Sequence, residues 1–290
     1  MTPEVTWPGG ARIAVMISFD FDAESIWLAR DPANARRPGV LSQGLYAVKR
    51  AVPKLMELLR EERMPASFFI PGWVVDHHTD RCKEIRDAGY EIGHHGYSHE
   101  WADPEHQEKE AEELDRASES LMRHLGVRPK GYRPPAAEIT DNTMRLLVER
   151  GFLYDTNMLD DVFPYRHVLP DGRPGPIELP THWSLGDANY ALTSIRHPRS
   201  IMPNHHILSI FQDEFAEIYR WGGLFNLVLH PQVIGRPSRI AMLRQFIAFT
   251  RRFPDVWYAT GTEIATAWAA QESPSPQRGE GGARREATGG

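Results

Sequence analysis

The chain has 290 residues, of which 41% are hydrophobic and 25% are charged, and its formal net charge is −6. These proportions are typical of a soluble globular protein, and the negative charge argues against nucleic acid or an anionic membrane as a partner. The first residues lack a basic stretch followed by a long apolar one, and no apolar run approaches membrane-spanning length. We therefore expect a cytoplasmic protein without membrane association.

Apolar, strand-like runs alternate with helical patterns along most of the chain. Arg12–Ser18 predicts a buried strand, and Leu45–Arg63 has the apolar spacing of an amphipathic helix. Ala66–Ile70 predicts the next strand, Arg81–Ala88 a short helix, and Tyr90–His94 another strand.

The second half of the chain continues the alternation. Asp103 followed by Pro104 predicts a helix start, and the apolar stripe behind it predicts a helix that ends at Gly126. The further strands that we expect are Gly131–Arg133, Phe152–Asp155, Leu224–His230 and Val256–Ala259. The further helices are Thr140–Arg150, Ile207–Trp221 and Arg239–Arg252.

Repeated strand–helix units predict a parallel sheet, either open or closed into a barrel. In such folds the chemistry gathers at the carboxyl ends of the strands. Several residues that carry chemistry lie at or just beyond such ends: Asp20, Asp22, His95, His99, Arg133 and His230.

The rest of the organisation is simple. We expect one catalytic domain over residues 1–271. Within it, residues 162–204 are rich in proline, glycine and aromatics, which predicts a loop-rich insertion that walls one side of a pocket. Residues 272–290 contain no large apolar side chain and are expected to form a disordered tail.

Asp20 and Asp22 are the first candidate site. Residues i and i+2 of a strand point to the same face, so both carboxylates should converge. The alternative is a solvated pair at a loop end, but Phe19 and Phe21 require burial where the charges lie. Buried like charges need a cation or a proton to coexist.

His95 and His99 are the second candidate site. Alone, an i, i+4 pair is weak evidence for a metal, because the chain has 13 histidines. A single helical turn before Asp103 would bring both rings to one side. One carboxylate with two imidazoles is the ligand set of a catalytic divalent metal, with a position left for water.

Arg133 and His230 complete the candidates. Arg133 precedes two prolines that form a rigid turn and hold the guanidinium in place; the alternative is a surface arginine at a strand end. His230 follows an apolar run and precedes Pro231. It is either a satisfied core histidine or, at the catalytic end of the sheet, a candidate acid.

The order Asp-x-Asp, His-x-x-x-His, Arg-Pro-Pro and Leu-x-x-His resembles the NodB-like polysaccharide deacetylase superfamily over residues 10–270. The resemblance implies an α/β fold, a distorted (β/α) barrel with fewer than eight regular units. It implies Asp20 as the general base, Arg133 as the residue that orients and tunes it, and His230 as the acid that protonates the leaving nitrogen. It implies Asp22, His95 and His99 as the metal ligands.

Two departures from the usual motifs of the superfamily resemble one of its branches. Phe21 separates aspartates that are usually adjacent, and Ala136 follows the prolines where an aromatic is usual. These features look like the branch that holds cyclic imide hydrolases, metal-free allantoinases and the Helicobacter-type peptidoglycan deacetylase. The resemblance implies a homotetramer with a restricted pocket, and the filled ligand positions argue against a metal-free allantoinase.

We therefore expect a metal-dependent hydrolase of non-peptide amide or imide C–N bonds, with one divalent ion per subunit and zinc as the first choice. The first choice of substrate is a small cyclic imide, opened to a half-amide; the alternative is de-N-acetylation of an N-acetylglucosamine unit, free or in peptidoglycan. A third hypothesis is a scaffold protein without activity, which should have lost one of the site residues. Glu24 and Trp183 are the expected substrate contacts, Trp183 and Tyr190 closing over a flat ring. The acid that supports His230 is left open among Asp160, Asp161 and Asp187.

Overall fold

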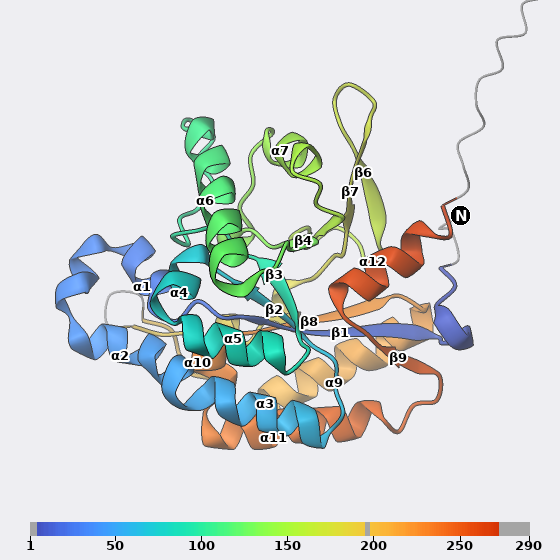
Figure 1. Ribbon diagram of the computed structural model, residues 1–290. Coiled ribbons are helices and arrows are strands. Elements are labelled where there is room, and N and C mark those ends of the chain that lie inside the picture. The colour runs from blue at the N-terminus through green and yellow to red at the C-terminus, as the bar shows by residue number, and fades with distance from the viewer. Residues whose placement is uncertain (1–4, 195–197, 273–290) are drawn as a thin grey trace, which may run out of the picture.

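Among the described residues, a curled sheet of nine strands forms the centre of the molecule (Figure 1). The computed structural model describes residues 5–194 and 198–272. The strand order is β6-β7-β5-β4-β3-β2-β1-β8, and β9 pairs with the first residues of β1. All described pairings are parallel except the β6–β7 hairpin. The strands are β1 (Ile13–Asp20), β2 (Ser67–Ile70), β3 (Glu91–His94), β4 (Gly131–Tyr132), β5 (Tyr154–Asp155), β6 (Tyr165–Val168), β7 (Pro174–Glu178), β8 (Leu224–Leu229) and β9 (Val256–Tyr258).

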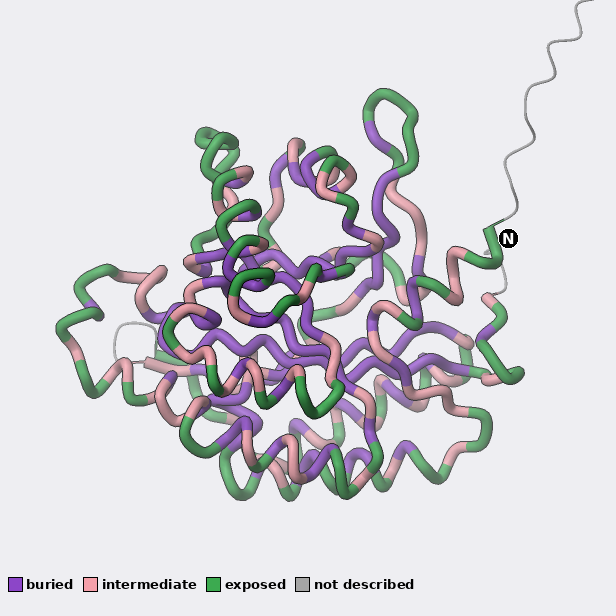
Figure 2. Tube along the Cα trace, viewed as in Figure 1, coloured by how far each residue is buried: buried purple, intermediate pink, exposed green. Residues whose placement is uncertain are grey.

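The helices lie mainly on the outer side of this sheet. They are α1 (Ser25–Arg30), α2 (Pro38–Tyr46), α3 (Val52–Glu61), α4 (Gly72–His77), α5 (Thr79–Asp87), α6 (Gln107–Leu125), α7 (Thr143–Glu149), α8 (Ala188–Ala191), α9 (Asn204–Trp221), α10 (Pro231–Ile234), α11 (Pro237–Thr250) and α12 (Gly261–Ala269). In Figure 2 the buried residues follow the central strands, while exposed ones line the outer helices and loops. Within the described residues, no helix combines the length and apolarity needed to cross a bilayer.

Strand β1 is buried on both faces, which explains its unbroken apolar sequence. On one face, Ile13, Val15, Ile17 and Phe19 join the large apolar cluster under α3, α9 and α11. On the other, Ala14 and Met16 belong to a second cluster in the interior of the curl. Ser18 and Asp20 continue this inner face, so the strand carries its first polar groups into the barrel.

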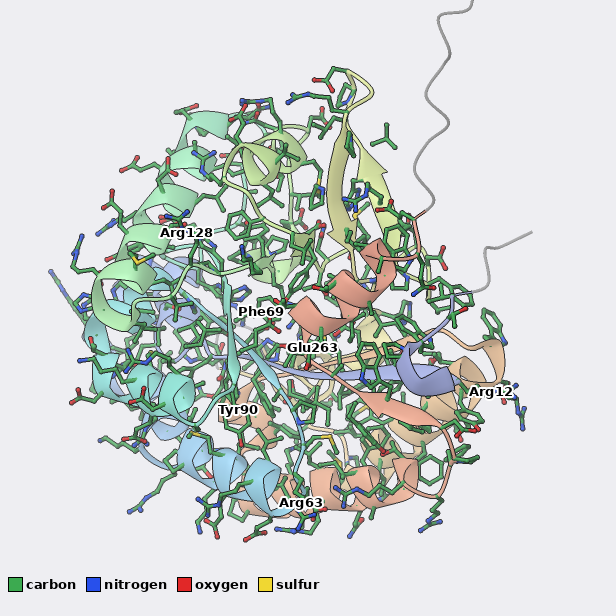
Figure 3. The ribbon with its side chains drawn as sticks, turned by 45° about the vertical axis from the view of Figure 1, so that its right-hand side comes forward. Arg12, Arg63, Phe69, Tyr90, Arg128 and Glu263 are labelled. Atoms are coloured by element: carbon green, nitrogen blue, oxygen red, sulfur yellow. The ribbon has the colours of Figure 1, made fainter. Side chains whose placement is uncertain are left out.

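The interior is filled by side chains and closed at one end by α12. Phe69 lies in the middle of the molecule in Figure 3, whereas Arg12 and Arg63 lie at its edge. The N–H of Gly261, the first residue of α12, donates to Ser67 Oγ at 3.0 Å, at the start of β2. Helix α12 therefore covers the amino ends of the strands, and the carboxyl ends open to solvent. The expected distorted (β/α) barrel is confirmed.

Most expected elements are present with shifted ends. The helix expected from Asp103 begins at Gln107 instead, because the Asp103 carboxylate accepts the N–H of Glu105 in a local turn. The helical turn expected between His95 and Asp103 is absent, and His99 has a left-handed φ of 65°.

The structure also describes the segment expected as a loop-rich insertion. Apart from 195–197, residues 162–204 contain the β6–β7 hairpin and α8, and β7 pairs with β5 in the main sheet. Of the expected tail, only Glu272 lies within the described residues, where its carboxylate accepts Arg166 Nε at 2.8 Å.

Candidate metal centre and active site

Three buried side chains at the carboxyl ends of β1 and β3 converge on one point. Asp22 Oδ1 lies 3.4 Å from His95 Nε2 and 3.6 Å from His99 Nε2. Asp22 is fully buried, and its Oδ1 accepts no hydrogen bond from any described residue. A buried carboxylate oxygen without a donor is costly unless a cation takes that place.

The backbone holds both imidazoles in a ligand-ready state. His95 Nδ1 lies 2.7 Å from the carbonyl oxygen of Arg133, so it carries the proton and leaves the lone pair of Nε2 directed at Asp22. His99 has the left-handed φ described above. A residue other than glycine adopts this conformation at an energetic cost, and it often marks a functional position.

Asp22 itself is fixed by a close contact between two segments. The next residue, Ala23, also has a positive φ, 47°, and its backbone packs against Gly44 of α2. A Cβ at Gly44 would lie 2.4 Å from the Ala23 carbonyl, so a side chain is excluded here. Gln232 Nε2 donates to Asp22 Oδ2 at 3.3 Å, which orients the other oxygen toward the histidines.

The donor set fits a divalent ion. Burial lowers the pKa of His99 to about 4, which keeps the ring neutral, the form that binds metal. Burial alone would raise the pKa of Asp22, but His99, His95 and His230 hold it well below its usual range. One carboxylate and two imidazoles match a catalytic zinc-type site with an open position.

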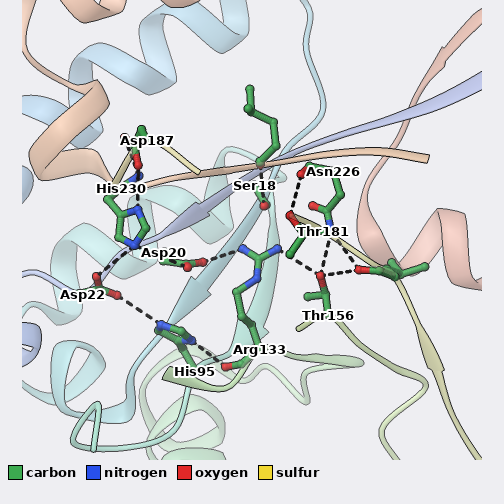
Figure 4. Close-up of polar contacts among 12 residues, drawn as sticks. Ser18, Asp20, Asp22, His95, Arg133, Thr156, Thr181, Asp187, Asn226 and His230 are labelled. Carbon is green, nitrogen blue, oxygen red and sulfur yellow. Dashed lines mark hydrogen bonds and ion pairs between the residues drawn. The ribbon is translucent and has the colours of Figure 1, made fainter. Parts of the chain in front are cut away.

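Asp20 lies beside this cluster and is held by an arginine. Arg133 Nη1 donates to Asp20 Oδ1 at 2.7 Å, and both side chains are nearly buried. The guanidinium lies 4.1 Å from the centre of the Phe69 ring, and its Nη2 donates to Thr156 Oγ1 at 3.4 Å. Because these contacts fix Arg133, Asp20 has one occupied oxygen and one oxygen free for a proton (Figure 4).

The free oxygen of Asp20 faces His230. His230 Nε2 lies 3.8 Å from Asp20 Oδ2 and 3.9 Å from Asp22 Oδ2. Its Nδ1 lies 2.8 Å from Asp187 Oδ1 (Figure 4). Burial opposes protonation of His230, but the hydrogen bond and charge of Asp187, with smaller effects from Asp22 and Asp20, raise its pKa to about 9. Asp187, rather than Asp160 or Asp161, is therefore the acid that supports His230.

The comparisons with known proteins agree with this arrangement. A family model described as polysaccharide deacetylase matches residues 42–154. A Mycobacterium smegmatis protein, crystallised as a candidate polysaccharide deacetylase, is 38% identical, with 92% of this chain and 94% of that one covered and a TM-score of 0.88. The chain belongs to the polysaccharide deacetylase family.

Two further proteins resemble this deacetylase-family chain over most of its length. The peptidoglycan deacetylase of Helicobacter pylori is 28% identical over 88% of this chain and 95% of its own length. The structure of Puue allantoinase, 24% identical, covers 95% of this chain and 96% of its own with a TM-score of 0.83, which shows a shared fold. The expected relationship to the Helicobacter-type branch is confirmed, and the chain is a carbon–nitrogen hydrolase of the deacetylase family.

A cavity of about 520 Å³ opens above the candidate active site of this chain. Asp20, His95, His99, Arg133 and His230 line its floor. Its rim carries Trp101 and Trp183, which are 57% and 51% exposed, and two cations, Arg30 and Arg199. Five of the predicted site residues thus line one pocket at the carboxyl edge of the sheet, with Asp22 buried against His95 and His99.

Of the side chains expected to contact the substrate, one lines the cavity and the others do not. Trp183 lines the cavity, as expected. Glu24 does not; its carboxylate is nearly buried and lies 2.8 Å from His78 Nε2. Tyr190 does not line it either, because its hydroxyl donates to the carbonyl of Ser184 and its ring packs on Phe211.

Sequence reasoning missed two supporting side chains. Gln232 orients Asp22 from the first turn of α10, two residues after His230. Thr156 binds the Arg133 guanidinium from the residue after β5 and donates to the carbonyl of Leu179. Their position just beyond strand ends, the same signal that singled out His230, was the available clue.

Proposed function

We propose that this chain is a metal-dependent deacetylase that removes the acetyl group from N-acetylglucosamine units of a saccharide. The observation that carries the proposal is the set gathered at one end of the cavity: a group of three possible metal ligands, a base held by arginine and an acid held by aspartate, with Asp22 and Asp187 buried behind the lining residues. A scaffold protein without activity would not need to retain all of these groups. The Helicobacter pylori relative, a peptidoglycan deacetylase, supports the saccharide over the cyclic imide.

Asp22, His95 and His99 would hold the ion, and we propose zinc because of this nitrogen and oxygen donor set. When bound, such an ion lowers the pKa of water and polarises a carbonyl. The remaining roles belong to the chain. Asp20 Oδ2 accepts a proton from the attacking water, while Arg133 on Oδ1 keeps this carboxylate oriented.

His230 provides the proton for the departing amine. An amide nitrogen leaves poorly as an anion, so it must be protonated as the C–N bond breaks. His230 Nε2 lies on the far side of Asp20 from Arg133, and Asp187 holds Nδ1 so that Nε2 points into the cavity. The raised pKa keeps this imidazole protonated at neutral pH.

The cavity rim supports a sugar. The exposed indoles of Trp101 and Trp183 offer flat apolar faces of the kind on which pyranose rings pack. Arg30 and Arg199 provide donors for ring hydroxyls or for an acidic substituent.

A second candidate function is the ring opening of small cyclic imides. One observation favours it: residues 181–189, with Trp183 among them, wall one side of a cavity of about 520 Å³, which suits a small flat ring. The homotetramer and the cytoplasmic location that the sequence predicts are proposals as well, and they are compatible with either substrate.

The test compares two substrate sets. The zinc-loaded enzyme is incubated with N-acetylated chito-oligomers, while acetate is measured, and with succinimide and phthalimide, while ring opening is measured. We expect acetate release that Asp20→Asn abolishes and that His205→Ala, at an exposed histidine on α9, leaves unchanged. Ring opening without acetate release would replace the saccharide with the imide, and no turnover of either set would refute both.

A further inference from the structure

A second histidine–carboxylate group lies outside the active site, where the β6–β7 hairpin joins the main sheet (Figure 1). It consists of Asp155 on β5, His167 on β6 and Glu178 on β7. Both carboxylates are fully buried, and the histidine side chain is 13% exposed. The mechanism above uses none of the three.

Their separations are those of ligands that share an ion. His167 Nε2 lies 3.4 Å from Asp155 Oδ1 and 3.2 Å from Glu178 Oε2. The contact with Glu178 is also a hydrogen bond, longer than the about 2.7–2.9 Å of a typical charge-assisted one. Donors placed tetrahedrally around zinc lie about 3.4 Å apart, given bond lengths of about 2.0–2.2 Å. The candidate metal ligands Asp22, His95 and His99 show a similar spacing, 3.4 and 3.6 Å.

The hydrogen bonds around these three side chains leave one carboxylate oxygen without a donor. Glu178 Oε1 accepts the N–H groups of Asn157 at 2.9 Å and Met158 at 3.1 Å. With its amide nitrogen turned inward, Asn157 also donates to Asp155 Oδ2 at 2.9 Å and Glu178 Oε2 at 3.2 Å. Asp155 Oδ1, completely buried and directed at His167, accepts no hydrogen bond from the described residues.

We propose that Asp155, His167 and Glu178 form a second divalent-cation site, distinct from the catalytic one. Two carboxylates balance the charge of the ion, and the exposed edge of His167 gives it a path from solvent.

The site would act as a clamp on three strands. It joins β5, β6 and β7, and the two residues after Asp155 reach the active-site cavity. Thr156 binds Arg133, and Asn157 lines the cavity wall. A cation here would therefore fix the wall that holds the arginine on the base, without taking part in the reaction.

The experiment counts ions in zinc-loaded, dialysed protein by inductively coupled plasma mass spectrometry. We expect two ions per chain in the wild type and in the His205→Ala control, one in His167→Ala and one in His99→Ala, and none in the double variant. A wild-type content of one ion that His167→Ala does not change would refute the second site, whatever the result for the substrate.

A stability measurement covers the case in which His167→Ala does not fold. His99→Ala, stripped with a chelator, retains the second group. Added zinc should raise its thermal midpoint and titrate as one site by calorimetry. An unchanged midpoint with no binding heat in His99→Ala would overturn the proposal.

Discussion

Replacing Asp187 with asparagine tests whether this carboxylate sets the proton affinity of His230. Asp187 is fully buried, lies 2.8 Å from His230 Nδ1, and accepts the backbone N–H of His230 at 3.0 Å. A hydrogen bond to a charged partner contributes about 1.5–3 kcal/mol, which corresponds to about 1–2 pKa units. Because Asp187 favours the imidazolium, its removal should lower the pKa of His230 by that amount, from about 9 in the wild type.

The pKa is measured directly by nuclear magnetic resonance of imidazole nitrogens in histidine-labelled, metal-free protein, and His230→Gln assigns the signal. Since the proposed mechanism uses protonated His230 as the acid, the alkaline limb of activity in zinc-loaded protein should move to lower pH in parallel. Asp160→Asn is the matched control, because Asp160 accepts the hydroxyl of Tyr165 and does not contact His230. A His230 signal that titrates at the same pH in Asp187→Asn as in the wild type would refute the assignment.

Three further predictions follow from the geometry. Asp20→Asn should retain zinc and lose turnover by about 10²–10⁴-fold, as expected for a general base; loss of zinc, measured by mass spectrometry, would exchange the roles of Asp20 and Asp22. His94 donates to the carbonyl of Leu114, and burial lowers its pKa from 6.5 to about 4. The unfolded chain therefore binds the extra proton, so stability falls as pH drops from 6.5 towards 4, by about 2 kcal/mol between pH 7.5 and 5; His94→Gln should flatten this part of the urea-unfolding profile, and an equally steep profile would contradict it. Gly131→Ala would place a Cβ 2.0 Å from Tyr154 Cζ, and thermal unfolding should show a loss of about 1–3 kcal/mol or more, whereas Gly89→Ala meets no atom and tests only backbone strain.

The sequence predicted the catalytic floor because parallel strands bring distant residues to one edge. Asp20 ends a recognisable strand, and His95, Arg133 and His230 each follow one, so their meeting required only the correct sheet. The contact between Asp187 and His230 spans 43 residues and starts in a segment without regular periodicity. Sequence alone could therefore list Asp187 among three acids but could not select it.

The errors have local causes. Asp103 and Pro104 have the composition of a helix start, but the aspartate side chain closes a turn instead, and the helix begins at Gln107. Tyr190 belongs to an aromatic segment, yet its ring turns toward α9 because Phe211 offers it a buried neighbour. Such choices depend on packing between segments, which no local pattern contains.

Arg133 serves the two halves of the site through different atoms. Its carbonyl oxygen accepts from His95, and its guanidinium donates to Asp20, so one residue at the end of β4 holds both a proposed metal ligand and the proposed base. Substituting the side chain would release only the base, since the carbonyl persists in every variant. Metal affinity and proton transfer can therefore diverge during evolution by changes at this single position.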